Sequence, residues 1–208
     1  MVLFWESLVC AGETQPGSRA DLREKPRRPL TSTLGVYGMN MLLSKFQIDE
    51  ALEPAHPSLA TLKKMSTVIP VYNEPVEIYV DLSDVTHGVQ EKTVQTINEV
   101  LGLSTDDRKH IQQLLFTNAK LAEQEVDFGI SVGNPDHPCT FENGISSVEE
   151  KIKFDGFSID ENDELNSRFA LFNILPKWEE EHGVSIVIKN GKPIALGDYQ
   201  DDLVPFDT

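Results

Sequence analysis

The chain contains 208 residues, of which 39% are hydrophobic and 25% are charged, and its formal net charge at pH 7 is −16. This length allows one domain with an appendage, or at most two small domains. No stretch approaches the ~18 consecutive apolar residues that a membrane helix requires, so no membrane span is predicted. Because a strongly acidic chain repels phosphate backbones and anionic lipids, we expect neither nucleic acid nor a membrane surface as its partner.

The composition of the chain changes near residue 40. Residues 1–40 hold 5 basic and 4 acidic side chains without helical or strand periodicity, whereas the remaining residues hold 13 basic and 30 acidic side chains. We therefore expect residues 1–40 to be a disordered or poorly ordered leader. Residues 41–208 are expected to form a single domain with its core over residues 67–203. The change falls just before Met39 and Met41, so a further hypothesis is that the leader is an upstream misreading of the start codon.

Two features of the sequence indicate a cytoplasmic protein. The chain has two cysteines, Cys10 and Cys139, and neither a CxxC pair nor a zinc-like spacing occurs, which suits a reducing compartment. In addition, Glu6 interrupts the apolar run at the N-terminus and no basic residue precedes it, so a cleaved secretory signal is not predicted.

The first strands are predicted between residues 67 and 83. This segment contains two short runs of alternating apolar and polar residues, with Pro70 and Pro75 as interruptions. Alternation with a period of two is typical of a half-buried strand. The residues expected on one side of the sheet are Val76, Ile78, Val80 and Leu82.

Two helices are predicted next. An apolar stripe with helical spacing runs through residues 94–101, and Gly102 provides a stop. A second helix is expected to begin after Ser104, whose side chain can cap it, with Asp106 and Asp107 in the positive first turn. The short connection predicts a helical hairpin that packs on one face of the sheet.

The C-terminal half is predicted to return to strands. Residues 126–132 and 169–175 are strand candidates, and the second is a nearly continuous apolar run that suits a central strand. Asn190 and Gly191 stand between two further strand-like runs, and this dipeptide adopts the positive φ angles of a tight type I′ turn. Pro193 cannot donate to the ladder and therefore favours the outer edge. The predicted fold is α+β: a mainly antiparallel sheet with a helical hairpin packed on one face and a C-terminal β-hairpin.

The densest group of titratable residues lies at residues 179–182, directly after Trp178. One interpretation is a structural turn, in which Trp178 packs in the core, Gly183 permits the turn, and Glu181 with His182 fixes the start of the hairpin by hydrogen bonding. The other is a binding surface that includes Glu181 and His182. A zinc metalloprotease helix would require two histidines on one face, and only one is present. We predict no catalytic residue and no metal ligand here.

A loop rich in turn-forming residues contains Asp136, His137 and Cys139. These side chains are permitted zinc ligands, but their spacing matches no known zinc finger. A cysteine nucleophile would need a base beside it, and the direction of His137 in a loop is not predictable. A surface turn is therefore the favoured interpretation.

A second acidic segment lies at residues 160–165. It begins like a calcium-binding loop but does not complete the D-x-[DN]-x-[DN]-G pattern, so a solvated acidic turn is predicted. The sequence also lacks a G-x-G-x-x-G motif, a Walker A motif and a G-x-S-x-G elbow, and we predict no cofactor. The side chains of this turn that could bind a basic partner are Asp160, Glu161, Asp163 and Glu164.

The motif after residue 177 resembles that of a known family. Trp178, Glu181, His182 and Gly183, followed by a strand, an Asn-Gly turn and a second strand, resemble the Trp-x-x-Glu-His-Gly signature of an uncharacterised bacterial domain family of unknown function. The resemblance extends over residues 67–203. It implies an immunity-protein-like or antitoxin-like domain with these four residues as signature positions, and it implies no catalytic activity.

The leading functional prediction is a non-catalytic acidic binding protein, in the form of an immunity protein that neutralises a basic toxin domain. Its acidic field would speed the encounter with a basic protein partner. One alternative is a metal-dependent hydrolase or other enzyme that uses His182 and Glu181. A second alternative is a structural or regulatory interaction module without a toxin partner. The sequence does not determine the oligomeric state.

Overall fold

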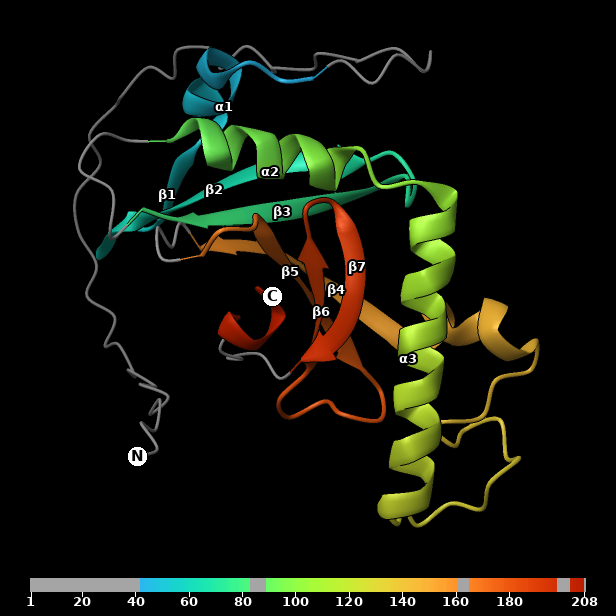
Figure 1. Cartoon of the computed structure of the whole chain (residues 1–208). Coiled ribbons are helices and arrows are strands. Elements are labelled where there is room, and N and C mark those ends of the chain that lie inside the picture. Colours follow the sequence, from blue (N-terminus) through green and yellow to red (C-terminus); the bar gives the residue numbers. More distant parts are fainter. Residues whose placement is uncertain (1–41, 83–88, 161–164, 198–202, 208) are drawn as a thin grey trace, which may run out of the picture. The chain divides into compact units, whose positions relative to one another are not determined.

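The computed structural model describes residues 42–82, 89–160, 165–197 and 203–207. The predicted leader, residues 1–40, lies outside them. The helices and strands, shown in Figure 1, are α1 (Lys45–Ala51), β1 (Glu53–His56), β2 (Leu59–Ile69), β3 (Glu74–Asp81), α2 (Glu91–Leu101), α3 (Thr105–Glu125), the 3₁₀ helix η1 (Gly144–Lys151), β4 (Ile152–Asp160), β5 (Phe169–Pro176), β6 (Val184–Lys189), β7 (Lys192–Gly197) and the 3₁₀ helix η2 (Val204–Phe206).

The strands form one seven-stranded sheet in the order of the sequence, β1 to β7. Neighbouring strands are antiparallel except β3 and β4, which are parallel. The parallel pair requires a crossover connection, and α2, α3 and η1 all lie within it. The α+β class and the mainly antiparallel sheet are therefore confirmed.

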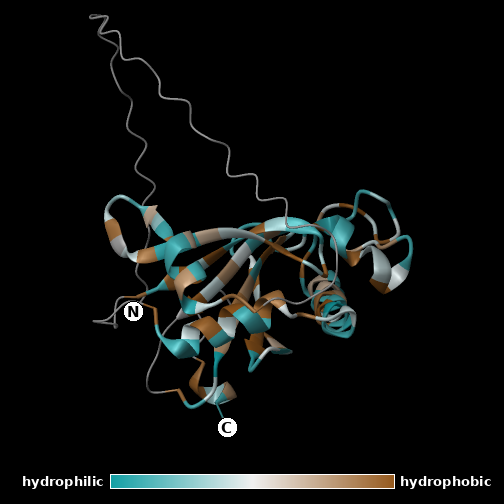
Figure 2. Ribbon diagram, turned by 90° about the horizontal axis from the view of Figure 1, so that it is seen from above, coloured by the Kyte–Doolittle hydropathy of each residue, from teal (hydrophilic) through white to brown (hydrophobic). Residues whose placement is uncertain are grey.

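One face of the sheet carries the main core. A row of apolar residues crosses successive strands in register, because Ile78 pairs with Phe157, Phe157 with Phe172, and Phe172 with Ile186. All four are fully buried, and the rings of Phe157 and Phe172 stack with their centroids 4.2 Å apart. Brown and teal alternate along the helices and strands in Figure 2, as amphipathic elements require. The face predicted for β3 is confirmed, since Val76, Ile78 and Val80 are buried.

Helices α2 and α3 follow each other across a short connection, as predicted. Gly102 ends α2, and Ser104 caps α3 by accepting a hydrogen bond from the backbone N–H of Asp107 at 3.2 Å. Both helices contribute to the main core. They cover different parts of it, because α2 packs against β2 and β5, whereas α3 turns away from α2 and packs against β7 and η1 (Figure 1). The pair thus forms a corner around the sheet.

The C-terminal hairpin of β6 and β7 is confirmed. Asn190 and Gly191 have φ angles of 48° and 75°, which are the positive values that a type I′ turn needs. Lys189 and Lys192 pair across this turn. Strand β7 is the last strand of the sheet, so Pro193 lies on an outer strand as expected.

The prediction of a strand over residues 126–132 is wrong. This segment belongs to a loop that follows α3. The Asp127 side chain accepts a hydrogen bond from the backbone N–H of Gly129 at 2.9 Å, and Gly129 has a φ of 68°, so the local turn replaces an extended backbone. Three of the four apolar residues that produced the alternating pattern are exposed; they are Val126, Ile130 and Val132. The fourth, Phe128, is partly buried against the main core.

The first turn of α3 is tied to the last strand of the sheet through Asp107. The carboxylate of Asp107, 7% exposed as a residue, accepts hydrogen bonds from the backbone N–H of Ser104 at 2.9 Å and from Lys192 Nζ at 3.0 Å. Burial disfavours the charged form, but the hydrogen bonds from Ser104 and Lys192 outweigh it and hold the pKa of Asp107 below its usual value. The ionised form of Asp107 therefore stabilises the fold.

Replacing Asp107 with Asn is expected to lower the free energy of unfolding at pH 7 by about 1–2 kcal/mol. Because the folded pKa is lowered, this stabilisation is present above the unfolded pKa of about 3.9 and is lost as the pH falls through the folded value. Urea denaturation from pH 7 to pH 2 should therefore show the cost of Asp107→Asn shrinking below about pH 4. The control Asp106→Asn removes an exposed carboxylate from the same turn and should cost less than about 0.5 kcal/mol. Equal costs for the two variants would contradict the role of Asp107.

Candidate functional site

The predicted signature lies in the turn between β5 and β6, which we call the signature turn (residues 178–183). Trp178 is 3% exposed. Its indole Nε1–H donates to Asn118 Oδ1 of α3 at 2.7 Å, and its ring makes an edge contact with Phe141 at a centroid distance of 5.9 Å. Trp178 thus joins the signature turn to α3 and to the loop that follows α3.

Gly183 closes the signature turn against β5. Its φ is 68°, and a Cβ at this position would lie 2.9 Å from the carbonyl oxygen of Ile174 and 3.0 Å from Leu175 Cδ2. The backbone N–H of Gly183 also donates to the carbonyl oxygen of Glu179 at 3.0 Å. Both the backbone conformation and the close approach therefore require glycine.

Glu181 and His182 stand on the outside of this rigid turn. Both are exposed, and the His182 side chain is 80% exposed. The imidazole Nδ1 of His182 lies 3.1 Å from Glu179 Oε1, so His182 has a local polar partner within the turn. In this turn the residue three positions earlier, rather than the adjacent one, faces the histidine ring.

The loop after α3, residues 126–143, contains His137 and Cys139, and both are buried. His137 Nδ1 accepts a hydrogen bond from the backbone N–H of Cys139 at 3.1 Å, and its ring makes an edge contact with Phe128. Burial, with a smaller effect from the carboxylate of Glu123, raises the pKa of the Cys139 thiol to about 11. The prediction of a surface turn is thus wrong for His137 and Cys139, because the loop folds them inward and keeps the thiol protonated.

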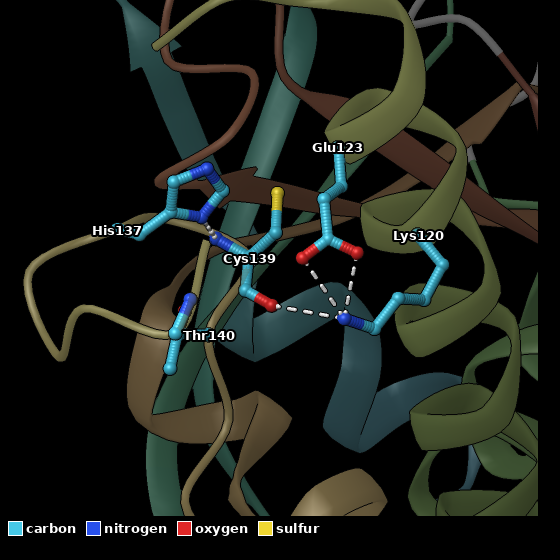
Figure 3. A network of polar contacts seen from close by, with 6 residues as sticks. Lys120, Glu123, His137, Cys139 and Thr140 are labelled. Atoms are coloured by element: carbon cyan, nitrogen blue, oxygen red, sulfur yellow. Dashed lines mark hydrogen bonds and ion pairs between the residues drawn. The ribbon is translucent and has the colours of Figure 1, made fainter. Parts of the chain in front are cut away.

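Lys120 of α3 fastens this loop to the helix (Figure 3). Its Nζ donates to Glu123 Oε2 at 2.8 Å and to the carbonyl oxygen of Cys139 at 3.4 Å. It also lies 5.7 Å and 5.9 Å from the ring centroids of Phe116 and Phe141. Because Phe141 contacts Trp178, Lys120 supports the same region that carries the signature turn. Sequence reasoning missed Lys120; its spacing of three residues from Glu123 on a helix was the available signal.

The predicted acidic turn falls largely outside the described residues. Glu161, Asp163 and Glu164 lie outside them, and for Asp160 the structure describes only the backbone at the end of β4. Among the described residues, no group of three His, Cys, Asp or Glu side chains is placed to hold a metal ion. In the same part of the chain, no helix is both long and apolar enough to cross a membrane.

Two glycines with the same φ allow the cost of backbone strain to be measured apart from the cost of steric contact. Gly129 also has a φ of 68°, but a Cβ there would meet nothing within 4 Å. We expect Gly129→Ala to cost about 1–2 kcal/mol through its left-handed backbone. Gly183→Ala should cost about 1–3 kcal/mol more, because the Ile174 carbonyl would have to move. Chemical denaturation measures both, and equal costs would show that Gly183 makes no close approach.

A second pair of variants separates the buried anchor from the exposed residues of the turn. Trp178→Ala is expected to lower the free energy of unfolding by about 3–5 kcal/mol, since a large buried side chain is removed. His182→Ala should change it by less than about 0.5 kcal/mol, as is usual for an exposed side chain. A large loss of stability in His182→Ala, measured by thermal or urea unfolding, would mean that His182 holds the turn together.

The comparisons with known proteins agree with the resemblance read from the sequence. A family model for a domain of unknown function, DUF6985, matches residues 52–204. The match includes all seven strands, α2, α3 and the signature turn. Searches of curated proteins and of solved structures find no significant match. Since the family model covers more than half of the chain, the chain belongs to the DUF6985 family of domains of unknown function.

Proposed function

We propose that this domain is a non-catalytic, acidic binding protein and that its signature turn is part of the surface that contacts a protein partner. The main support is the contrast within the turn. Trp178 and Gly183 are buried and fixed by contacts with α3 and β5, whereas Glu180, Glu181 and His182 are exposed. Exposed charged side chains on a rigid scaffold are suited to recognition, because little backbone conformational freedom is lost when the partner binds.

The surroundings of His182 favour binding over catalysis. A catalytic histidine is oriented by a neighbour and placed beside a second reactive group. In the part of the chain that the structure describes, the polar partner of His182 is Glu179, whose own side chain is 41% exposed, and the pair faces solvent. The alternative of a metal-dependent hydrolase that uses His182 and Glu181 draws no support from this geometry.

The charge of the chain indicates the class of partner. Residues 41–208 hold 13 basic and 30 acidic side chains. Close to the signature turn, Glu142 is exposed and follows Phe141, which contacts Trp178. We infer a basic protein as the partner, because the negative electrostatic field of an acidic domain speeds its encounter with a positively charged protein.

An immunity protein that neutralises a basic toxin domain in the cytoplasm is the specific form of this proposal. Covering the active surface of a toxin requires rigid, charged contacts and no chemistry, which fits the signature turn. The acidic turn, with Asp160, Glu161, Asp163 and Glu164, is proposed as a second part of the surface. A structural or regulatory interaction module would use the same surface and differ only in the partner that it captures.

The proposal is tested with the full chain as bait in a lysate of its natural host. A basic protein should be retained at low salt and released at high salt, because the attraction is screened. Its association rate, measured by surface plasmon resonance with the purified partner, should fall several-fold for the double variant Glu180→Gln/Glu181→Gln. The double variant Asp49→Asn/Glu50→Gln removes the same charge from exposed positions on α1 and is the matched control.

Three results would contradict the proposal. One is that no basic protein is retained at any salt concentration. Another is that the turn variant and the α1 control slow association equally, which would leave only a general effect of net charge. The third is a chemical activity of the purified chain that is lost in His182→Ala, which would favour the enzyme alternative.

A further inference from the structure

The sheet has a second, smaller apolar cluster on the face opposite the main core. Ile186 and Ile188 of β6 belong to the main core, and the residue between them, Val187, points to the other face because side chains alternate along a strand. There Val187 is fully buried together with Leu165 and Phe169. Leu203 and Phe206, from the end of the chain, pack against these residues.

Polar contacts also fix the same end of the chain. The Asp207 carboxylate accepts hydrogen bonds from the backbone N–H of Asn166 at 2.7 Å and of Ser167 at 2.8 Å. The Asn166 side chain also donates to Asp207 at 3.2 Å. In addition, Lys189 Nζ donates to the carbonyl oxygen of Phe206 at 2.7 Å.

We infer that residues 203–207 form a C-terminal clasp that closes over the apolar surface of Phe169 and Val187 and opens separately from the main core. This inference is independent of the proposed partner and of the signature turn. The clasp belongs to a cluster distinct from the main core, and η2 contains only three residues. Segments with few buried apolar contacts open at a lower free energy than the core of a fold.

The nature of the contacts explains why the clasp is closed and yet able to open. Asp207 is held ionised, because the backbone N–H of Asn166 and then the groups of Ser167 lower its pKa to about 2. Its hydrogen bonds with Asn166 are at the exposed surface, where water can replace them. Val204, in the middle of the clasp, is 57% exposed. The only apolar cover of Phe169 and Val187 that the clasp provides is therefore Leu203 and Phe206.

Opening of the clasp uncovers apolar surface of the sheet. It exposes Phe169, Val187 and the partly buried Leu171 as one apolar surface on the outer face of β5 and β6. In the closed form, Leu203 and Phe206 occupy this surface and keep other apolar segments away from it. The backbone amides of Asn166 and Ser167 lose the Asp207 carboxylate as their acceptor when the clasp opens. Their rate of hydrogen exchange therefore reports the opening directly.

Hydrogen exchange of the full chain, followed by NMR, tests the clasp. Asp207→Asn should speed exchange at the amides of Asn166 and Ser167 by about tenfold or more, as the loss of hydrogen bonds to a charged group predicts. The amides of β5 and β6 that pair Phe172 with Ile186 should keep their exchange rates. Asp136→Asn, which neutralises an exposed residue of the loop after α3, is the matched control and should change neither set.

A second variant reports on the apolar surface itself. Phe206→Ala should increase the fluorescence of a dye that binds apolar surface, while the urea midpoint of the main core stays unchanged. If either variant instead speeds exchange throughout β5 and β6, the C-terminal residues are part of the main cooperative unit and the clasp does not exist. Unchanged exchange at Asn166 and Ser167 in Asp207→Asn would equally overturn the inference.

Discussion

The parallel pairing of β3 with β4 is the constraint on which the rest of the structure depends. It joins two antiparallel sets of strands, β1–β3 and β4–β7, into a single sheet. At this seam Gly156 has a φ of 127°, and a Cβ there would lie 2.5 Å from the carbonyl oxygen of Glu77. The strands approach this closely only because Gly156 has no side chain. The approach aligns Ile78 with Phe157 and so makes one continuous core out of two smaller sheets.

The same seam explains why the candidate site lies where it does. Parallel neighbours cannot be joined by a tight turn, so the chain must leave the sheet after β3 and return before β4. The crossover supplies α2 and α3, which cover the core, and the loop in which His137 and Cys139 are buried. Asn118 and Phe141 both belong to this crossover and both contact Trp178. The signature turn is therefore held by residues that the topology of the sheet brings to it.

Features encoded by neighbouring residues could be predicted from the sequence, whereas those that depend on distant residues could not. Ser104 caps α3 and Asn190 turns the last hairpin through local geometry alone. Residues 126–132 show the limit of such prediction. A strand needs a partner strand, and the alternation of apolar and polar residues does not reveal that the chain turns at Gly129. The partners of Trp178, Asn118 and Phe141, lie far from it in the sequence. Nothing in the residues around either of them indicates a contact with Trp178. The partner of His182 is close in the sequence, but which of the neighbouring glutamates faces the imidazole depends on the shape of one turn.

The arrangement at the two ends of the sheet bears on how the protein behaves at high concentration. An outer strand offers unpaired backbone groups to which another chain can add, and this is a common route to aggregation. Strand β7 is lined by α3, which packs along it. At the opposite end, β1 has only four residues and contains Pro54, which has no backbone N–H to donate. Neither end is a good template for strand addition, so a domain that exposes charged and apolar residues elsewhere is protected from forming extended β-sheet aggregates through its edges.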